Sequence, residues 1–167
     1  MANPTYNRII RKLVVGFGNL FKDITLVRYN PDLTEAERFL IPIAYATKER
    51  YVMRLQEDPY LDKKIQTNLP RMSFEITGIT YDAARKQNSL LKTNKTSTST
   101  SAATAYMGVP YDITFSLNVY ARNIDDGTQI VEQILPFFNP DFTVSAKMVP
   151  DLGFYKDIPI VLNNVTN

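Results

Sequence analysis

The stretch from Asp125 to Phe142 constrains the fold of this chain more than any other part of the sequence. Its apolar side chains recur at the spacing of one helix face, and they are Val131, Ile134, Leu135 and Phe138. Its polar residues fall off that face, and they are Thr128, Gln129, Glu132 and Gln133. Asp125 and Asp126 suit a helix start, and Pro136 predicts that the regular helix ends near Leu135. We therefore expect a short helix packed across a sheet.

Two residue types are absent from the 167-residue sequence, and their absence limits its chemistry. Without histidine there is no histidine base, no Ser-His-Asp or Cys-His system and no histidine-bound metal. Without cysteine there are no disulfides and no thiolate metal sites. Residues 125–127 lack the spaced oxygen ligands of a calcium loop, and the pairs Glu35/Glu37 and Glu57/Asp58 are typical of solvated surface. We expect no enzyme, no cofactor and no metal site.

Charge and hydropathy favour an ordinary globular domain. The 19 basic and 17 acidic residues give a net charge of only +2, which does not indicate nucleic acid as the main partner. No apolar run approaches the roughly 20 residues that span a bilayer, and the N-terminus lacks the hydrophobic core of a signal peptide. We expect a single domain over residues 1–167 and no membrane segment.

The first helix is expected from about Pro4 to Phe21, with Asn3 as its cap. Its apolar face follows helical spacing and consists of Ile10, Leu13, Val14, Phe17 and Phe21. Gly16 and Gly18 each cost about 1 kcal/mol relative to alanine, and they indicate an early end or a close backbone approach. Three basic residues lie mostly on another face, where we expect solvent, a partner or a neighbouring subunit: Arg8, Arg11 and Lys12.

Alternating or β-branched segments predict strands in much of the remaining chain. The predicted strands are 24–29 pairing with 38–45, then 72–79, 111–121, 142–149 and 158–162. Pro42 and Pro159 cannot donate to a ladder, so we expect their strands at sheet edges that face partners, or a bulge at Pro42. Gly78 indicates a bulge. Between the strands we expect a helix from Lys48 to about Gln56 and a short helical or irregular piece over 61–69. The pattern predicts an α+β fold with a mixed, mainly antiparallel sheet and two packed helices, the second near 125–136.

Residues 82–108 break the pattern of alternating strands and helices. The segment 92–101 is polar, of low complexity and without apolar side chains to bury. Loops beyond about 12–15 residues are uncommon inside compact domains and are usually functional or mobile. We interpret residues 82–108 as an arm or long hairpin with a Ser/Thr-rich tip, and a plain surface loop is the alternative. The arm would order against an adjacent subunit or a partner through Leu90, Leu91, Lys92 and Lys95.

Four blocks of sequence together resemble a family of phage proteins. They are residues 41–50 (IPIAYATKER), 69–72 (LPRM), 129–142 (QIVEQILPFFNPDF) and 157–162 (DIPIVL). In this order they resemble the tail sheath stabiliser and tail completion proteins of T4-like contractile-tailed bacteriophages. The third block is the most specific, because a generic helix does not explain its glutamines, prolines and paired aromatics. The Ser/Thr-rich arm matches the family least. Family members can continue beyond a strand like the last one here, so the resemblance implies a short or trimmed version.

The resemblance implies a tail-terminator-like subunit that assembles as a homohexameric ring at the head-proximal end of the tail. Such a ring caps the tail tube terminator and the last sheath disc, and it offers a surface to neck and head-completion proteins. The expected location is the virion, after assembly in the host cytoplasm. DNA passing through the lumen would not be bound sequence-specifically. Two other interpretations stay open: another neck or head–tail connector ring, and a small carboxylate-based cell-wall hydrolase.

Overall fold

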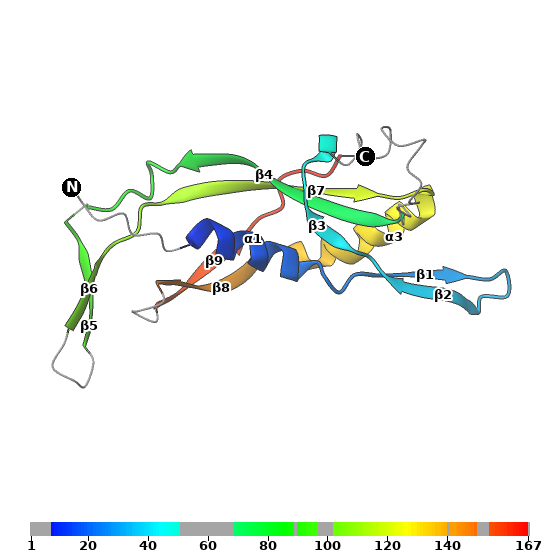
Figure 1. Cartoon of the computed structure of the whole chain (residues 1–167), viewed down its shortest axis with the longest axis horizontal. Helices are drawn as coiled ribbons and strands as arrows, with labels where there is room; N and C mark the ends of the chain where they lie inside the picture. Colours follow the sequence, from blue (N-terminus) through cyan, green and yellow to red (C-terminus); the bar gives the residue numbers. More distant parts are fainter. Residues whose placement is uncertain are drawn as a thin grey trace, which may run out of the picture.

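The computed structural model describes residues 8–50, 69–88, 90–96, 102–139, 141–149 and 154–166, with the backbone alone over 93–96, 102–106 and 147–149 and at residue 154. The elements in chain order are α1 (Ile9–Leu20), β1 (Thr25–Tyr29), β2 (Glu35–Leu40), β3 (Ile43–Tyr45), β4 (Arg71–Tyr81), β5 (Lys92–Thr96), β6 (Ala102–Tyr106), β7 (Tyr111–Tyr120), α3 (Ile124–Ile134), η1 (Leu135–Phe138), β8 (Phe142–Val149) and β9 (Phe154–Ile160) (Figure 1). The predicted α+β class is confirmed.

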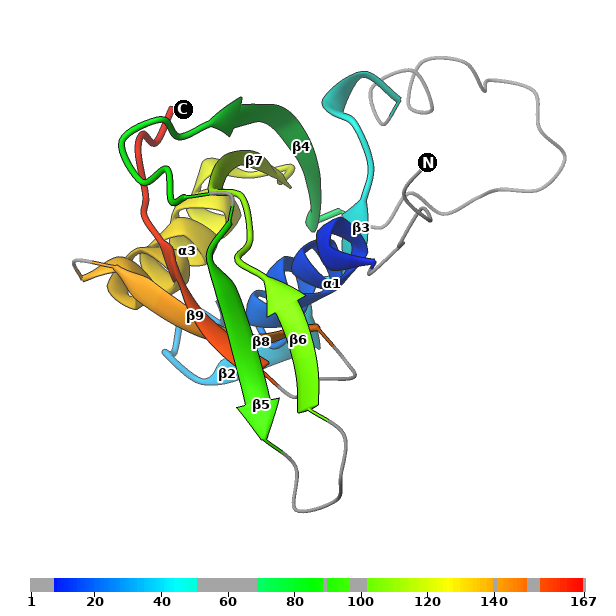
Figure 2. The ribbon, with the colours of Figure 1, turned by 90° about the vertical axis from the view of Figure 1, so that its left-hand side faces the viewer.

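The strands form one three-stranded sheet and three separate hairpins. In the sheet the order is β3-β4-β7, with β3 parallel and β7 antiparallel to β4. The hairpins are β1–β2, β5–β6 and β8–β9, all antiparallel. The helices α1 and α3 lie against one face of the sheet, and β8–β9 lies on their far side (Figure 2). The predicted mixed sheet is therefore divided into smaller sheets around the two helices.

The core lies where α1, α3 and the three-stranded sheet meet. Phe17 of α1 stacks on Phe115 of β7 with the ring centroids 4.4 Å apart and an interplanar angle of 7°. The rings of Phe17 and Phe21 meet edge to face, with their centroids 5.1 Å apart. Such aromatic pairs contribute about 0.5–1.5 kcal/mol beyond the burial of their area. The buried apolar residues are Phe17, Phe21, Ile24, Leu26, Ile41, Met72, Phe74, Ile130 and Ile134.

Helix α1 begins later than its sequence predicts. Arg8 has a left-handed backbone (φ 54°), and the helical run starts at the next residue. The predicted cap and first residue, Asn3 and Pro4, lie outside the described residues. Phe17 and Phe21 are buried as expected, and Val14 packs against the core cluster that contains them. The prediction is wrong for Ile10, whose side chain in the first turn is 50% exposed.

The two glycines of α1 have different surroundings. A Cβ atom added at Gly18 would lie 3.0 Å from Cζ of Phe74, whereas one added at Gly16 would meet nothing within 4 Å. Gly18 is therefore the close approach that the sequence indicated. The Phe74 ring is held between Phe17 and Tyr45, so it has little room to move away.

Replacing these glycines with alanine is expected to change stability in opposite directions. Gly16→Ala should raise the free energy of unfolding by about 0.5–1 kcal/mol, because alanine restricts the unfolded chain and favours the helix. Gly18→Ala should lower it by about 1–3 kcal/mol, because the added methyl overpacks the core against Phe74. Urea unfolding of both variants checks the pair. Equal shifts of the same sign would show that Gly18 is not in close contact.

The alternating residues 38–45 belong to two strands that lie in different sheets. Strand β2 ends at Leu40, and β3 begins at Ile43 in a different sheet. The predicted single strand is therefore wrong, although 38–40 do pair with β1. Pro42 lies between the two strands, neither in an edge strand nor at a bulge, and its carbonyl accepts a hydrogen bond from the N–H of Met72 (2.9 Å). Strand β3 is nevertheless an edge of its sheet.

The other predicted segments have mixed outcomes. The bulge near Gly78 is confirmed by a register shift between Ile76 and Gly78. Strand β7 and strand β8 match their predictions closely. Strand β9 begins and ends earlier than the predicted 158–162, and Pro159 pairs opposite Thr143 in a two-stranded sheet. Residues 48–50 are helical, and the rest of the helix predicted to Gln56 lies outside the described residues, as do residues 61–68.

Helix α3 confirms the predicted helix and corrects its buried face. It ends at Ile134 and continues as the 3-10 turn η1, with Pro136 near the start of that turn. The buried apolar side chains are Ile130 and Ile134, whereas Leu135 is 42% exposed and Val131 only half-buried. The cap position is Asn123, and the two aspartates occupy the first turn. The helix is therefore rotated relative to the face that the spacing predicted.

Candidate assembly surfaces

Two hairpins extend away from the core at opposite ends of the elongated molecule (Figure 1). At one end is the arm, which continues the long strands β4 and β7 into β5–β6. At the other end is the hairpin β1–β2. Each forms a two-stranded sheet of its own. Isolated two-stranded sheets are marginally stable, so what holds each hairpin decides whether it can present a defined surface.

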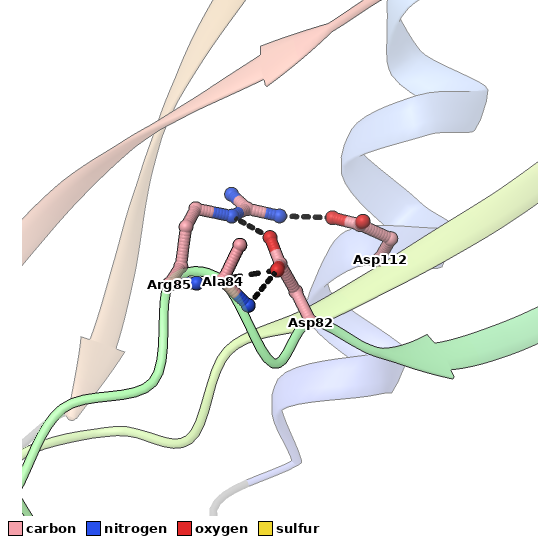
Figure 3. A network of polar contacts seen from close by, with 4 residues as sticks. All are labelled: Asp82, Ala84, Arg85 and Asp112. Atoms are coloured by element: carbon pink, nitrogen blue, oxygen red, sulfur yellow. Dashed lines mark hydrogen bonds and ion pairs between the residues drawn. The ribbon is translucent and has the colours of Figure 1, made fainter.

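An exposed charge network ties together the two strands at the base of the arm (Figure 3). Asp82 follows β4, and its carboxylate accepts hydrogen bonds from the backbone N–H of Ala84 (2.9 Å) and of Arg85 (3.2 Å). The guanidinium of Arg85 donates to Asp82 and also to Asp112 of β7. The side-chain hydrogen bond from Arg85 is the largest contribution that lowers the pKa of Asp82, and the same bond raises the pKa of Arg85. The network fixes where the arm leaves the sheet.

The arm base should weaken in acid. The folded-state pKa of Asp82 lies below its ordinary value of 3.8, so the carboxylate contributes stability above that pH. The contribution is lost as the pH falls through the lower folded-state pKa, because protonation removes the charge that Arg85 binds. Carbon-13 NMR titration of the Asp82 carboxyl should give a midpoint below 3.8. Arg85→Gln should move the midpoint upward, and an unchanged midpoint would contradict the network.

The predicted interface residues of the arm lie on its first strand and just before it. Leu90 is 78% exposed and Leu91 is 50% exposed. Lys92 and Lys95 belong to β5, and the side chain of Lys95 is outside the described part of the structure. The arm is a hairpin in which β5 and β6 pair antiparallel, as the first of the two interpretations predicted. An interface role for these four residues stays a prediction.

The predicted basic residues of the N-terminal helix lie on a different element. Arg8 precedes α1 and Arg11 lies within it, and both are exposed. Lys12 is half-buried, and its backbone N–H donates to the carbonyl of Arg8 (3.0 Å) in the first helical turn. The structure therefore divides the predicted interface between two elements, α1 and the arm. An interface role for these residues also stays a prediction.

The hairpin β1–β2 is a surface that the sequence analysis missed. Two glutamines of α3 occupy the edge of β1 that β2 leaves open. The side-chain amide of Gln129 accepts a hydrogen bond from the backbone N–H of Val27 and donates another to the Val27 carbonyl, each 3.1 Å long. Gln133 donates to the carbonyl of Thr25 at 2.8 Å. The side chains assigned to the polar face of the helix thus bind backbone groups as a neighbouring strand would.

An ion pair also attaches the hairpin to α3. The guanidinium of Arg28 lies 2.8 Å from the carboxylate of Asp126, whose side chain is only 9% exposed. The hydrogen bond to Asp126 raises the pKa of Arg28. Arg28 also lies 3.6 Å from Glu37 and 5.2 Å from the centre of the Phe39 ring. These contacts hold the hairpin at a fixed angle to the core.

The outer part of the hairpin is exposed. In β2 only Phe39 is half-buried and the other residues are exposed. At the turn, Leu33 has a left-handed backbone (φ 59°) and a side chain that is 85% exposed. The turn is closed by hydrogen bonds of 2.9 Å from the N–H of Leu33 to the carbonyl of Asn30 and from the N–H of Asn30 to the carbonyl of Thr34. The hairpin therefore presents an ordered apolar tip.

The described residues contain no group of three or more acidic side chains that could hold a metal ion. Glu35 and Glu37, one of the carboxylate pairs considered for hydrolysis, bind Arg38 and Arg28 on the exposed hairpin. The other pair, Glu57 and Asp58, lies outside the described residues. Within the part of the chain that the structure describes, no helix is long and apolar enough to cross a membrane.

Comparison with known proteins confirms the resemblance drawn from the four sequence blocks. The chain matches the family described as T4-like virus Myoviridae tail sheath stabiliser over residues 4–167. It is also similar to tail completion protein gp15 of Enterobacteria phage T4, with 33% identity over 165 residues. The match covers 94% of this chain and 60% of that relative, so the chain spans less than two thirds of the relative's length. The family consists of structural, non-enzymatic components of the phage tail. This chain belongs to the T4-like tail sheath stabiliser family.

Proposed function

We propose that this chain forms a six-fold ring at the head-proximal end of a contractile phage tail. There it stabilises the sheath, completes the tail and provides the surface to which the neck and head attach. The observation that carries the proposal is the family match over residues 4–167. In this proposal residues 1–167 act as one tail-terminator-like domain with its arm, and the partners are further copies, the sheath, the tube terminator and neck proteins.

The shape of the subunit supports a ring. A ring needs two different surfaces on each copy, placed so that head-to-tail contacts close. The arm and the hairpin β1–β2 are two such surfaces, and they lie at opposite ends of the molecule (Figure 1). Both have sheet edges at which a further strand can be added.

The physical effect on the sheath follows from linkage. The last disc of a sheath has contact surfaces that no further disc occupies. A ring that binds this disc in the extended arrangement more tightly than in the contracted one shifts the equilibrium toward the extended tail. The size of the shift is set by the difference between the two affinities, so no catalytic group is needed.

Electron microscopy of tails with and without this protein tests the proposal. We expect a ring of density at the head-proximal end of tails that carry the protein. Tails from a phage lacking it should have unstable sheaths and fail to join heads, and adding the purified protein should restore joining. Mass measurement of the protein, alone and with tails, gives the number of copies. Absence of density at this end would overturn the proposal, and binding to a neck component without binding to tails would favour the connector alternative.

A further inference from the structure

The outer edge of β2 is open to a partner strand. Within the described residues β2 pairs only with β1, while the far edge of β1 is occupied by Gln129 and Gln133. Because α3 fixes β1, the open edge of β2 is held in one position. Open edges are places where another chain can add a strand. Residues 32–37 also carry three carboxylates and no basic side chain, the carboxylates being Asp32, Glu35 and Glu37.

Leu33 is an unusual residue for its position at the tip. Three-residue hairpin loops place a residue in the left-handed region, where glycine or asparagine fits best. A left-handed backbone is costly for leucine because of its Cβ atom. Its side chain is 85% exposed, so packing of the side chain within the chain does not compensate for this cost. Strained backbone positions recur at binding sites, so Leu33 is a candidate residue for a contact with another chain.

The arm has the complementary properties. Residues 83–108 contain no acidic side chain and include the basic residues Lys86, Lys92 and Lys95, besides Arg85, which binds Asp82 and Asp112 at the base of the arm. Leu90 and Leu91 provide exposed apolar surface next to β5. Strand β6 has the sequence AATAY, without the charges or proline that usually protect an edge strand. The arm is therefore basic and apolar, whereas residues 32–37 at the tip of the hairpin β1–β2 are acidic and apolar. Glu35 and Glu37 also pair with Arg38 and Arg28 of their own hairpin, so a partner's lysines would add to these ion pairs.

We infer that the hairpin β1–β2 of one copy binds the β5–β6 arm of the next copy, with the β2 edge adding to the arm and Leu33 packing near Leu90 and Leu91. The inference rests on the proposed ring and names its contact between subunits. Since the arm and the hairpin lie at opposite ends of the molecule, they cannot bind each other within one copy (Figure 1). The contact is therefore heterologous, which is the kind that a ring requires.

Sedimentation velocity on the full chain tests the contact with three variants. Leu33→Asn introduces a residue that tolerates the left-handed turn. It should weaken each contact about tenfold or more, because the leucine side chain that the contact would bury is lost. The reversals E35K/E37K and K92E/K95E should each weaken self-association. Combining all four reversals in one chain should restore it to near the wild-type level, because the charges are again opposite.

Controls separate the contact from folding and from the proposed function. The exposed carboxylates Glu132 and Asp141 lie outside both surfaces, so E132K/D141K should assemble normally. Thermal unfolding shows whether each variant is folded, and Leu33→Asn remains informative if E35K/E37K disturbs the pairs with Arg28 and Arg38.

If assembly needs tails, copies bound to purified tails are counted instead. Normal rings from Leu33→Asn and both reversals would overturn the contact and leave the function standing. Failure of the wild-type chain to bind tails would overturn the function.

Discussion

A chain lacking residues 92–103 is expected to fold but not to form rings. The deletion removes β5 and the start of β6, leaving residues 104–106 as a short loop between Leu91 and Met107, whose backbones are already hydrogen-bonded at 3.0 Å. None of the buried apolar core residues lies in the deleted segment, so the midpoint of thermal unfolding should change little. The expected result is a folded monomer that does not join tails to heads.

The effect on assembly should be large because the contacts of a ring multiply. If each contact loses about 1.4 kcal/mol, its affinity falls about tenfold, and six such contacts reduce closed-ring formation about a million-fold. Sedimentation velocity and negative-stain microscopy of completed tails measure the loss. A matched control replaces residues 97–101 with a glycine-serine segment of equal length, which leaves β5 and β6 in the chain. Normal rings and normal tail length from the deletion would show that the arm has no assembly role.

The pattern of apolar residues predicted the elements better than it predicted their neighbours. The alternation over 38–45 continues through β2 and β3, although the first pairs with β1 and the second with β4. Periodicity reports which side chains share a face and is silent about which strand lies beside them. The turn that carries the chain from the hairpin to the central sheet at Pro42 is therefore a tertiary feature, and alternation alone could not locate it.

The arm was predictable and the hairpin surface was not. A polar, low-complexity segment of this length cannot bury a core, so the sequence indicates that residues 92–101 leave the globular part. The exposed edge of β2 depends instead on α3 binding the opposite edge of β1. That contact is made by Gln129 and Gln133, one helical turn apart, which lie on the polar side in any sequence-based helical wheel. A pair of glutamines at this spacing is the signal that could have suggested it.

Ile130→Ala is expected to be among the most destabilising single substitutions in the helix α3. Its side chain is fully buried (0% exposed) in the core, where it shares a cluster with Leu26 and Met72. Loss of its three outer carbons removes apolar burial and leaves a cavity, which typically costs about 2–5 kcal/mol in the free energy of unfolding. The same residue lies between the two glutamines that hold β1, so the hairpin should also lose order. Urea unfolding and hydrogen exchange of Val27 measure these two effects.

Leu135→Ala provides the matched comparison, because the sequence pattern placed Leu135 on the buried face and did not place Ile130 there. Leu135 is 42% exposed at the start of η1, so its truncation should cost under about 1 kcal/mol. A helix rotated to the predicted face would give the opposite order, with Leu135→Ala the more damaging change. That order would also be incompatible with the bonds from Gln129 and Gln133 to β1, since rotating α3 to bury Leu135 would move both amides away from the strand. The two substitutions therefore test the packing of α3 by urea unfolding and the anchoring of the β1–β2 hairpin by hydrogen exchange of Val27.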